Sequence, residues 1–156
     1  MDISLPNELL VQIIQHSPAG KQAILCRLSR LFHDLCVPVL YRVVEIKDSD
    51  SVALFCSAII ANPSRAGAVR SFTVDVSRSR IEHYGDLLLA SLKLMLRLDH
   101  LFLSQTALDY GQSSILLEEC IFPQLISCDI WAPSWSKNES VSDLVAAFLA
   151  RHSTLK

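Results

Sequence analysis

The chain has 156 residues, 51% of them hydrophobic, and a formal net charge of −2. This charge argues against a nucleic-acid or anionic-membrane surface as the partner, because both attract strongly basic proteins. No apolar run reaches the roughly 18 residues of a membrane-spanning helix, and the first residues are acidic where a secretory signal would be basic. We therefore expect no nucleic-acid partner, no membrane partner, and a location in the cytoplasm and/or the nucleus.

Residues 5–14 predict a short helix. Pro6 suits its first turn, where a missing N–H costs nothing, and Glu8 favours the positive end of the helix dipole. Two adjacent apolar rows run along it at a spacing of four residues, Leu9 with Ile13 and Leu10 with Ile14. The helix is apolar over more than half of its circumference, so we expect it to have two neighbours.

Residues 21–35 predict further helical structure. Their apolar side chains recur at intervals of three and four, at Ile24, Leu25, Leu28, Leu31, Phe32 and Leu35. Pro38 predicts the end of this structure, because the residue before a proline is disfavoured in the α region. The β-branched segment at residues 43–46 then predicts a strand.

Three pieces of this region carry a family resemblance. They are Leu5-Pro6-x-Glu8-Leu9-Leu10-x-x-Ile13-Ile14, then Leu28-Ser29-Arg30-Leu31-Phe32-x-x-Leu35, then Pro38-x-Leu40-Tyr41-Arg42-x-Val44. Together they resemble the F-box, a three-helix module, and the last piece resembles its fungal members especially. The sequence departs from the family at His16-Ser17, where an apolar residue is usual, so the beginning of the second helix stays open. The resemblance places the break between the second and third helices near Ser29.

The resemblance implies an F-box over residues 1–42. Such a module docks on the Skp-family adaptor, which in turn joins the cullin scaffold of a ubiquitin ligase. The adaptor-binding residues would be Leu5, Pro6, Glu8, Leu9, Leu10, Ile13, Ile14, Leu25, Leu28, Leu31 and Phe32. The alternative is that these side chains pack only on the helices of the module itself.

Strand-like segments recur from residue 43 onward. They are Val44-x-Ile46, Phe72-x-Val74, Leu101-x-Leu103, Leu125-x-Ser127 and the final Leu155, whose first residues lie 28, 29, 24 and 30 residues apart. The middle three have an apolar residue three positions earlier, at Val69, Leu98 and Phe122. This spacing is typical of leucine-rich repeats. We expect residues 43–156 to form an α/β solenoid, with a parallel sheet in sequence order on its concave side and the helices on its convex side.

Four helices are expected between these strands. They cover residues 51–61, 86–98 (nearly all buried), 114–120, and a last helix that opens with a capping box at Ser140. Lys156 stops in or directly after a predicted strand, with no capping helix. We therefore expect an incomplete array, a fragment of a longer repeat protein.

We expect no enzyme, and no catalytic, cofactor-binding or metal site. The five cysteines contain no C-x-x-C pair and stand beside apolar residues, which predicts reduced, buried thiols. All four glycines are isolated, so no phosphate-binding loop is present. Ser29, His33 and Asp34 would share one helix and cannot form a catalytic triad. One local basic cluster is expected to be a solvated rim, namely Arg65, Arg70, Arg78 and Arg80.

Trp131 and Trp135 follow the fourth predicted strand, on an expected loop. Either one indole contacts a protein substrate, since Trp often dominates binding energy, or both rings cover the sheet edge. The leading hypothesis is a substrate-recognition subunit of a Skp-cullin-F-box ubiquitin ligase. The alternatives are an F-box protein with a structural or regulatory role and a fragment without a function of its own. A hydrolase or redox enzyme on an αβ scaffold is a remote alternative, because the sequence contains none of the motifs that such enzymes use. The sequence does not identify the protein substrate.

Overall fold

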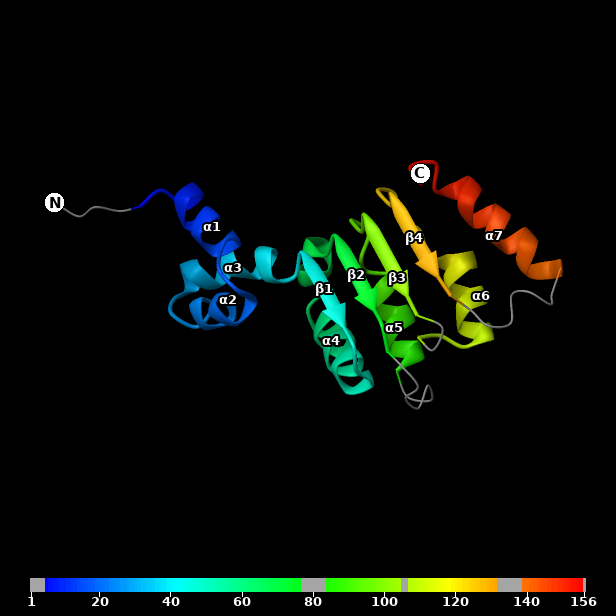
Figure 1. Cartoon of the computed structure of the whole chain (residues 1–156), viewed down its shortest axis with the longest axis horizontal. Helices are drawn as coiled ribbons and strands as arrows, with labels where there is room; N and C mark the ends of the chain where they lie inside the picture. Colours follow the sequence, from blue (N-terminus) through cyan, green and yellow to red (C-terminus); the bar gives the residue numbers. More distant parts are fainter. Residues whose placement is uncertain (1–4, 77–83, 105–106, 132–138, 156) are drawn as a thin grey trace.

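A computed structural model describes residues 5–76, 84–104, 107–131 and 139–155. Three N-terminal helices are followed by four strands that alternate with helices (Figure 1). The elements are α1 (Asn7–Gln15), α2 (Ala19–Leu25), α3 (Arg30–Leu40), β1 (Val43–Ile46), α4 (Ser49–Ala61), the 3₁₀ helix η1 (Pro63–Ala68), β2 (Ser71–Val74), α5 (Gly85–Leu92), β3 (His100–Leu103), α6 (Tyr110–Glu119), β4 (Ser127–Ile130) and α7 (Glu139–Arg151). The chain is therefore an α/β protein, as predicted. None of the helices in the described ranges is long and apolar enough to cross a membrane.

The three N-terminal helices begin at residues that suit a helix start. Pro6 and Pro18 precede α1 and α2 with extended backbone, at ψ angles of 143° and 148°. Ser29 precedes α3, and its Oγ accepts a hydrogen bond from the N–H of Phe32 at 3.2 Å. This cap satisfies one of the free amides of the first turn. The predicted break near Ser29 is confirmed, and the second helix begins at Ala19.

A buried amide joins α1 to α2. The Nε2 of Gln22 donates to the carbonyl oxygens of Ile14, at 2.9 Å, and Ser17, at 2.8 Å. Ile14 lies in the last turn of α1, where its carbonyl also accepts from the amide of Ser17 at 3.0 Å, and Ser17 lies two residues past the end of the helix. Gln22 therefore closes the C-terminal end of α1 and fixes the turn into α2.

The helix α3 continues through Pro38 to Leu40, so the prediction that Pro38 ends helical structure is wrong. A proline inside a helix removes one backbone hydrogen bond. Here the missing bond falls near the end of the helix, and the ladder continues past it, since the N–H of Tyr41 donates to the carbonyl of Val37 at 3.0 Å. The helix thus tolerates Pro38 for the two residues that remain.

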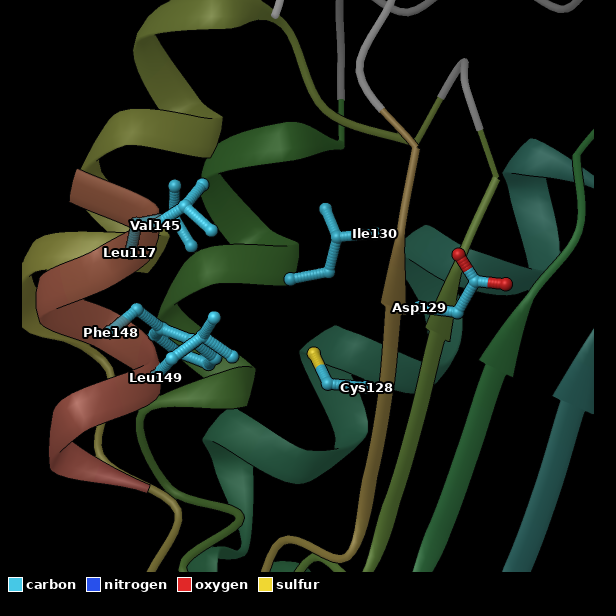
Figure 2. A pocket seen from close by; sticks show the side chains of 7 residues that line it. All are labelled: Leu117, Cys128, Asp129, Ile130, Val145, Phe148 and Leu149. Atoms are coloured by element: carbon cyan, nitrogen blue, oxygen red, sulfur yellow. The ribbon is translucent and has the colours of Figure 1, made fainter. Parts of the chain in front are cut away.

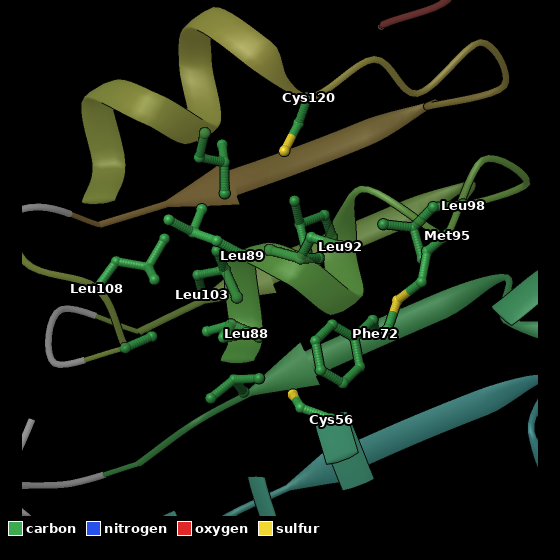
Figure 3. Packing of buried hydrophobic residues seen from close by; sticks show 14 of the residues in the cluster. Cys56, Phe72, Leu88, Leu89, Leu92, Met95, Leu98, Leu103, Leu108 and Cys120 are labelled. Atoms are coloured by element: carbon green, nitrogen blue, oxygen red, sulfur yellow. The ribbon is translucent and has the colours of Figure 1, made fainter. Parts of the chain in front are cut away.

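The four strands form one parallel sheet in the order β1-β2-β3-β4, which confirms the predicted sheet order. Alternate strand residues are buried beneath the helices: Ile46, Phe72, Val74, Leu101 and Leu103. Figure 3 shows Phe72 and Leu103 packed against the leucines of α5. The opposite face, which we call the open face, carries exposed residues such as Glu45 and Phe102. One face of the sheet therefore holds the core, and the other is left to solvent by the described elements.

One backbone pattern repeats before each of the last three strands. The amides of Arg70 and Ser71 donate to the carbonyl of Arg42, those of Asp99 and His100 to Arg70, and those of Ile126 and Ser127 to Asp99. Directly before each pair stands a fully buried residue, at Val69, Leu98 and Leu125. Each repeat therefore turns into its strand through the same bonds over the same buried anchor.

The fourth repeat lies in a different frame from the predicted one. Cys128, and not Leu125, pairs in register with Leu101. The row of equivalent residues is 44, 72, 101 and 128, at intervals of 28, 29 and 27. Leu125 takes the anchor position that the sequence pattern assigned to Phe122.

Leu155 does not begin a fifth strand, contrary to prediction. The described residues after α7 form a turn in which the amide of Leu155 donates to the carbonyl of His152 at 3.1 Å. The same three-residue bond precedes the earlier strands, for example from the amide of Leu125 to the carbonyl of Phe122. Leu155 therefore resembles the anchor residues and not the strand residues.

Two helices differ in extent from their predicted ranges. The helix α5 ends at Leu92, short of the predicted 98. Of the six leucines expected to be nearly all buried, Leu88, Leu89 and Leu92 are buried, Leu87 and Leu94 are half-buried against the core, and only Leu96 is exposed, at 55%. The helix α6 begins at Tyr110, earlier than predicted, because Asp109 and Gln112 form a reciprocal capping box. The capping box predicted at Ser140 lies outside the residues whose side chains the structure describes.

The C-terminal end of α7 is fixed to α6 and to the loop before β4. The guanidinium of Arg151 donates to the carbonyls of Leu117 and Glu118 at the end of α6. His152 is 2% exposed, and its Nε2 accepts a hydrogen bond from the amide of Phe122 at 2.9 Å. The bonds from Arg151 satisfy carbonyls that the end of α6 leaves without helical partners, and His152 satisfies a buried amide of the loop that follows.

Candidate protein-docking surfaces

The N-terminal helices expose two apolar stripes. One follows α1 through Leu5, Leu9 and Ile13, which are 50%, 44% and 54% exposed. The other follows the end of α2 and the start of α3 and consists of Ile24, Leu28 and Leu31, at 59%, 63% and 48%. Leu9 and Ile13 share one face of α1, which Leu5 precedes. The second stripe spans the end of α2, the turn that follows it and the start of α3. So many exposed large apolar side chains within about 30 residues are typical of a surface that binds another protein.

The structure divides the predicted adaptor-binding residues into three groups. Exposed are Leu5, Pro6, Glu8, Leu9, Ile13, Leu28 and Leu31; half-buried are Leu10, Leu25 and Phe32; fully buried is Ile14. Ile14 is therefore a core residue of the helical unit, and its side chain has no surface to offer a partner. Ile24, which is 59% exposed, was not among the predicted residues, although it belongs to the same apolar series of the sequence as Leu28 and Leu31.

The open face presents four residues in one register row, Glu45, Thr73, Phe102 and Asp129. Phe102 is 37% exposed, and Glu45 and Asp129 are exposed. Figure 2 shows Cys128 and Ile130 pointing toward the helices, whereas Asp129 between them points to the other side. The strand alternation thus places a ring, a hydroxyl and two carboxylates in line on a solvent-facing surface.

Trp131 continues the open face beyond the end of β4. Its amide donates to the carbonyl of Leu103 at 3.0 Å, which extends the hydrogen-bond ladder by one residue. By strand alternation its indole lies on the same face as Asp129, and the residue is 61% exposed. Trp131 is thus available to a partner, whereas Trp135 lies outside the described residues.

A groove borders the last strand of the described sheet (Figure 2). It is lined by Leu117 of α6, by Cys128, Asp129 and Ile130 of β4, and by Val145, Phe148 and Leu149 of α7. Burial raises the pKa of Cys128 to about 12, so the thiol stays protonated near neutral pH. Apart from Cys128 and Asp129, the side chains that line the groove are apolar.

The predicted basic rim is partly built into the fold. Arg65 lies with its guanidinium carbon 5.6 Å from the ring centre of Tyr41, and it donates to the Tyr41 hydroxyl at 3.3 Å. Arg70 pairs with Asp99 at 3.7 Å. The other two arginines of the cluster lie outside the described residues. Arg65 and Arg70 are therefore structural, and the prediction of a solvated rim is wrong for them.

The described residues offer no recognisable catalytic arrangement. They contain no group of three His, Cys, Asp or Glu side chains placed to hold a metal. Ser29 is used as a helix cap, and the Nδ1 of His33 lies 3.4 Å from the carboxylate of the adjacent Asp34 on a solvent-exposed helix surface. Burial also raises the pKa of Cys36 and Cys120 to about 11, which suppresses thiolate chemistry.

No protein-family model matches this chain, and no curated protein matches it.

Proposed function

We propose that the chain is the substrate-recognition subunit of a Skp-cullin-F-box type ubiquitin ligase. In this proposal an F-box within residues 1–42 docks on a Skp-family adaptor, and leucine-rich-repeat-like residues 43–156 recruit a protein substrate. The observation that carries it is the pair of apolar stripes on the N-terminal helices, in which every residue except Ile24 belongs to the motif pieces that resemble the F-box. The ligase chemistry comes from other subunits, in the cytoplasm or nucleus, through a cullin bound to the adaptor.

The size of the stripes is adequate for stable docking. Fully burying a Leu or Ile side chain gains about 1.5–3 kcal/mol. The six stripe residues are close to half exposed, so covering them would gain roughly 5–9 kcal/mol before the costs of association. The proposal therefore assigns the binding energy mainly to these residues and not to Glu8 at the start of α1.

The test compares charged substitutions at apolar positions that are all more than half exposed. Ile13→Asp and Leu28→Asp each place a carboxylate in one stripe, and Leu54→Asp places one at a residue of α4 that is 73% exposed. We expect the first two to abolish co-purification with a Skp-family adaptor and the third to leave it unchanged. All three positions are exposed, so circular dichroism should show folded protein in each case. Equal adaptor binding by all three variants would contradict the proposal.

The second candidate function is an F-box protein with a structural or regulatory role. The apolar stripes serve this function as well, because it needs the adaptor but not the ligase. Co-purification of the cullin separates the two. A ligase receptor brings down both cullin and adaptor, whereas the second candidate brings down the adaptor alone.

A further inference from the structure

The open face of the sheet differs from the N-terminal stripes in its chemistry. Among the described residues it bears three carboxylates, Glu45, Asp75 and Asp129, against a single ammonium group on Lys47. Lys47 and Glu45 are already paired at 2.9 Å. Asp129 has no ion-pair partner among the described residues, and it stands beside two accessible aromatic rings. A surface of this kind attracts cations and repels anions.

We infer that the open face binds an extended basic segment of the recruited protein, with one Lys or Arg side chain held over Phe102 beside Asp129. This inference rests on the proposed function for the identity of the partner. The geometry of the site comes from the sheet alone. The helices α4 to α7 pack on the opposite face, so the described fold leaves this one without a covering element.

Phe102 and Asp129 are direct neighbours across two strands. They are register partners in the β3–β4 pairing, and neighbouring strands lie about 4.8 Å apart. A cation over the face of the Phe102 ring is attracted by the ring quadrupole, and the adjacent carboxylate adds charge-assisted hydrogen bonds. One ammonium or guanidinium group can therefore contact both side chains at once.

The neighbours of this pair favour a segment that lies along the sheet. Trp131 lies one pleat beyond Asp129 on the same strand and offers a second ring, and Thr73 offers a hydroxyl on the other side of Phe102. The backbone groups of β2 and β3 are already used in the sheet, so recognition must come from side chains. Alternate side chains of an extended segment would contact the row from Glu45 to Asp129. Because this row carries negative charge, it favours a cationic side chain at the contact.

The experiment measures binding of labelled nonapeptides to the full chain by fluorescence anisotropy. The probes alternate Thr with Lys, with Arg or, as the matched neutral control, with Gln. We expect saturable binding of the Lys and Arg peptides that weakens with salt, and at least about tenfold weaker binding of the Gln peptide. Equal binding of all three peptides, or no saturable binding of the basic ones, would overturn the inference.

Three variants locate the site. Asp129→Asn and Phe102→Leu should each weaken Lys-peptide binding about three- to tenfold, because each removes one contact of the same cation. The control Glu118→Gln makes the same chemical change as Asp129→Asn at an exposed carboxylate of α6, and it should leave binding within about twofold. If the control weakens binding as much as Asp129→Asn does, attraction is only diffuse and the inference fails.

A charge-reversal variant distinguishes loss of the binding site from loss of the fold. Asp129→Lys should lose the Lys peptide and gain binding of a nonapeptide that alternates Thr with Glu, which an unfolded variant would not do. Adaptor binding, measured on the same samples, reports the N-terminal stripes and not the open face. Intact adaptor binding without basic-peptide binding therefore refutes this inference alone, and the converse result refutes only the proposed function.

Discussion

Replacing His152 should destabilise the C-terminal end of the protein by a predictable amount. The Nε2 of its imidazole accepts from the buried amide of Phe122 at 2.9 Å, and its Nδ1 bonds the carbonyl of Phe148 at 2.7 Å. Since the carbonyl can only accept, Nδ1 carries the proton and Nε2 is the free acceptor. The ring centre also lies 4.1 Å from that of Phe148. One side chain therefore satisfies two backbone groups and fills the space between α7 and the loop before β4.

Two substitutions separate these contributions. His152→Phe keeps a ring of similar size but leaves the Phe122 amide without its acceptor, which costs about 1–3 kcal/mol. His152→Ala loses the same acceptor and also leaves a cavity, so we expect about 3–5 kcal/mol in total. Ser153→Ala, at the exposed neighbouring position, should change stability by no more than about 0.5 kcal/mol.

The assay is urea unfolding at pH 7, followed by far-UV circular dichroism and analysed with a shared slope for all variants. The expected order of stability is Ser153→Ala, then His152→Phe, then His152→Ala. If both His152 variants unfold within about 0.5 kcal/mol of the unmodified chain, the buried bond to Phe122 does not support the fold and the reasoning is refuted.

Three further predictions follow from single residues. The amide of Ser51 bonds the Asp48 carboxylate and lowers its pKa below the usual 3.8, so the stability it contributes is present above that value and is lost as the pH falls through the lower, folded-state pKa. Asp48→Ala should lower the urea midpoint at pH 7 and reduce the loss of stability on acidification below pH 4, whereas parallel pH curves would contradict the cap. Cys120 and Cys128, with pKa values raised to about 11 and 12 by burial, should resist iodoacetamide at pH 8 until urea unfolds the chain, and rapid native alkylation would show that they are accessible. Trp131, 61% exposed, should be quenched by iodide in a Trp135→Phe variant; resistance to quenching would place its indole in the core.

Much of the sheet could be predicted from periodic apolar residues. Val44, Phe72 and Leu101 stand in one register row, as their spacing indicated. The fourth repeat was misplaced because the same template fits two frames there. The predicted frame begins the strand at Leu125, whereas the correct frame places Cys128, a small apolar side chain, in the strand row.

The candidate surfaces show where periodicity stops being informative. A spacing of four puts Ile14 on one side of α1 and Ile13 on another, but it does not say which side meets the other helices. That choice depends on tertiary contacts such as the bond from Gln22 to the Ile14 carbonyl, which turns this side inward. The prediction that Pro38 ends the helix was wrong for a related reason. The preference of the residue before a proline for extended backbone was overridden in the last turn of a packed helix.

The site inferred on the open face was out of reach of sequence reasoning. Phe102 and Asp129 are 27 residues apart, and only the strand register makes them neighbours. The sequence pattern had set the fourth strand in the wrong frame. Trp131 could be singled out by its residue type, but its exposure depends on the strand continuing past Ile130.

The measurement that tests the central claim most directly is hydrogen exchange of the full chain with and without a purified Skp-family adaptor. Docking through the apolar stripes predicts a stable complex in which amide protection rises in residues 5–15 and 24–32 and stays unchanged in β1–β4. The absence of a complex, or protection confined to the sheet and its helices, would contradict the assignment of the N-terminal helices as the adaptor-docking surface.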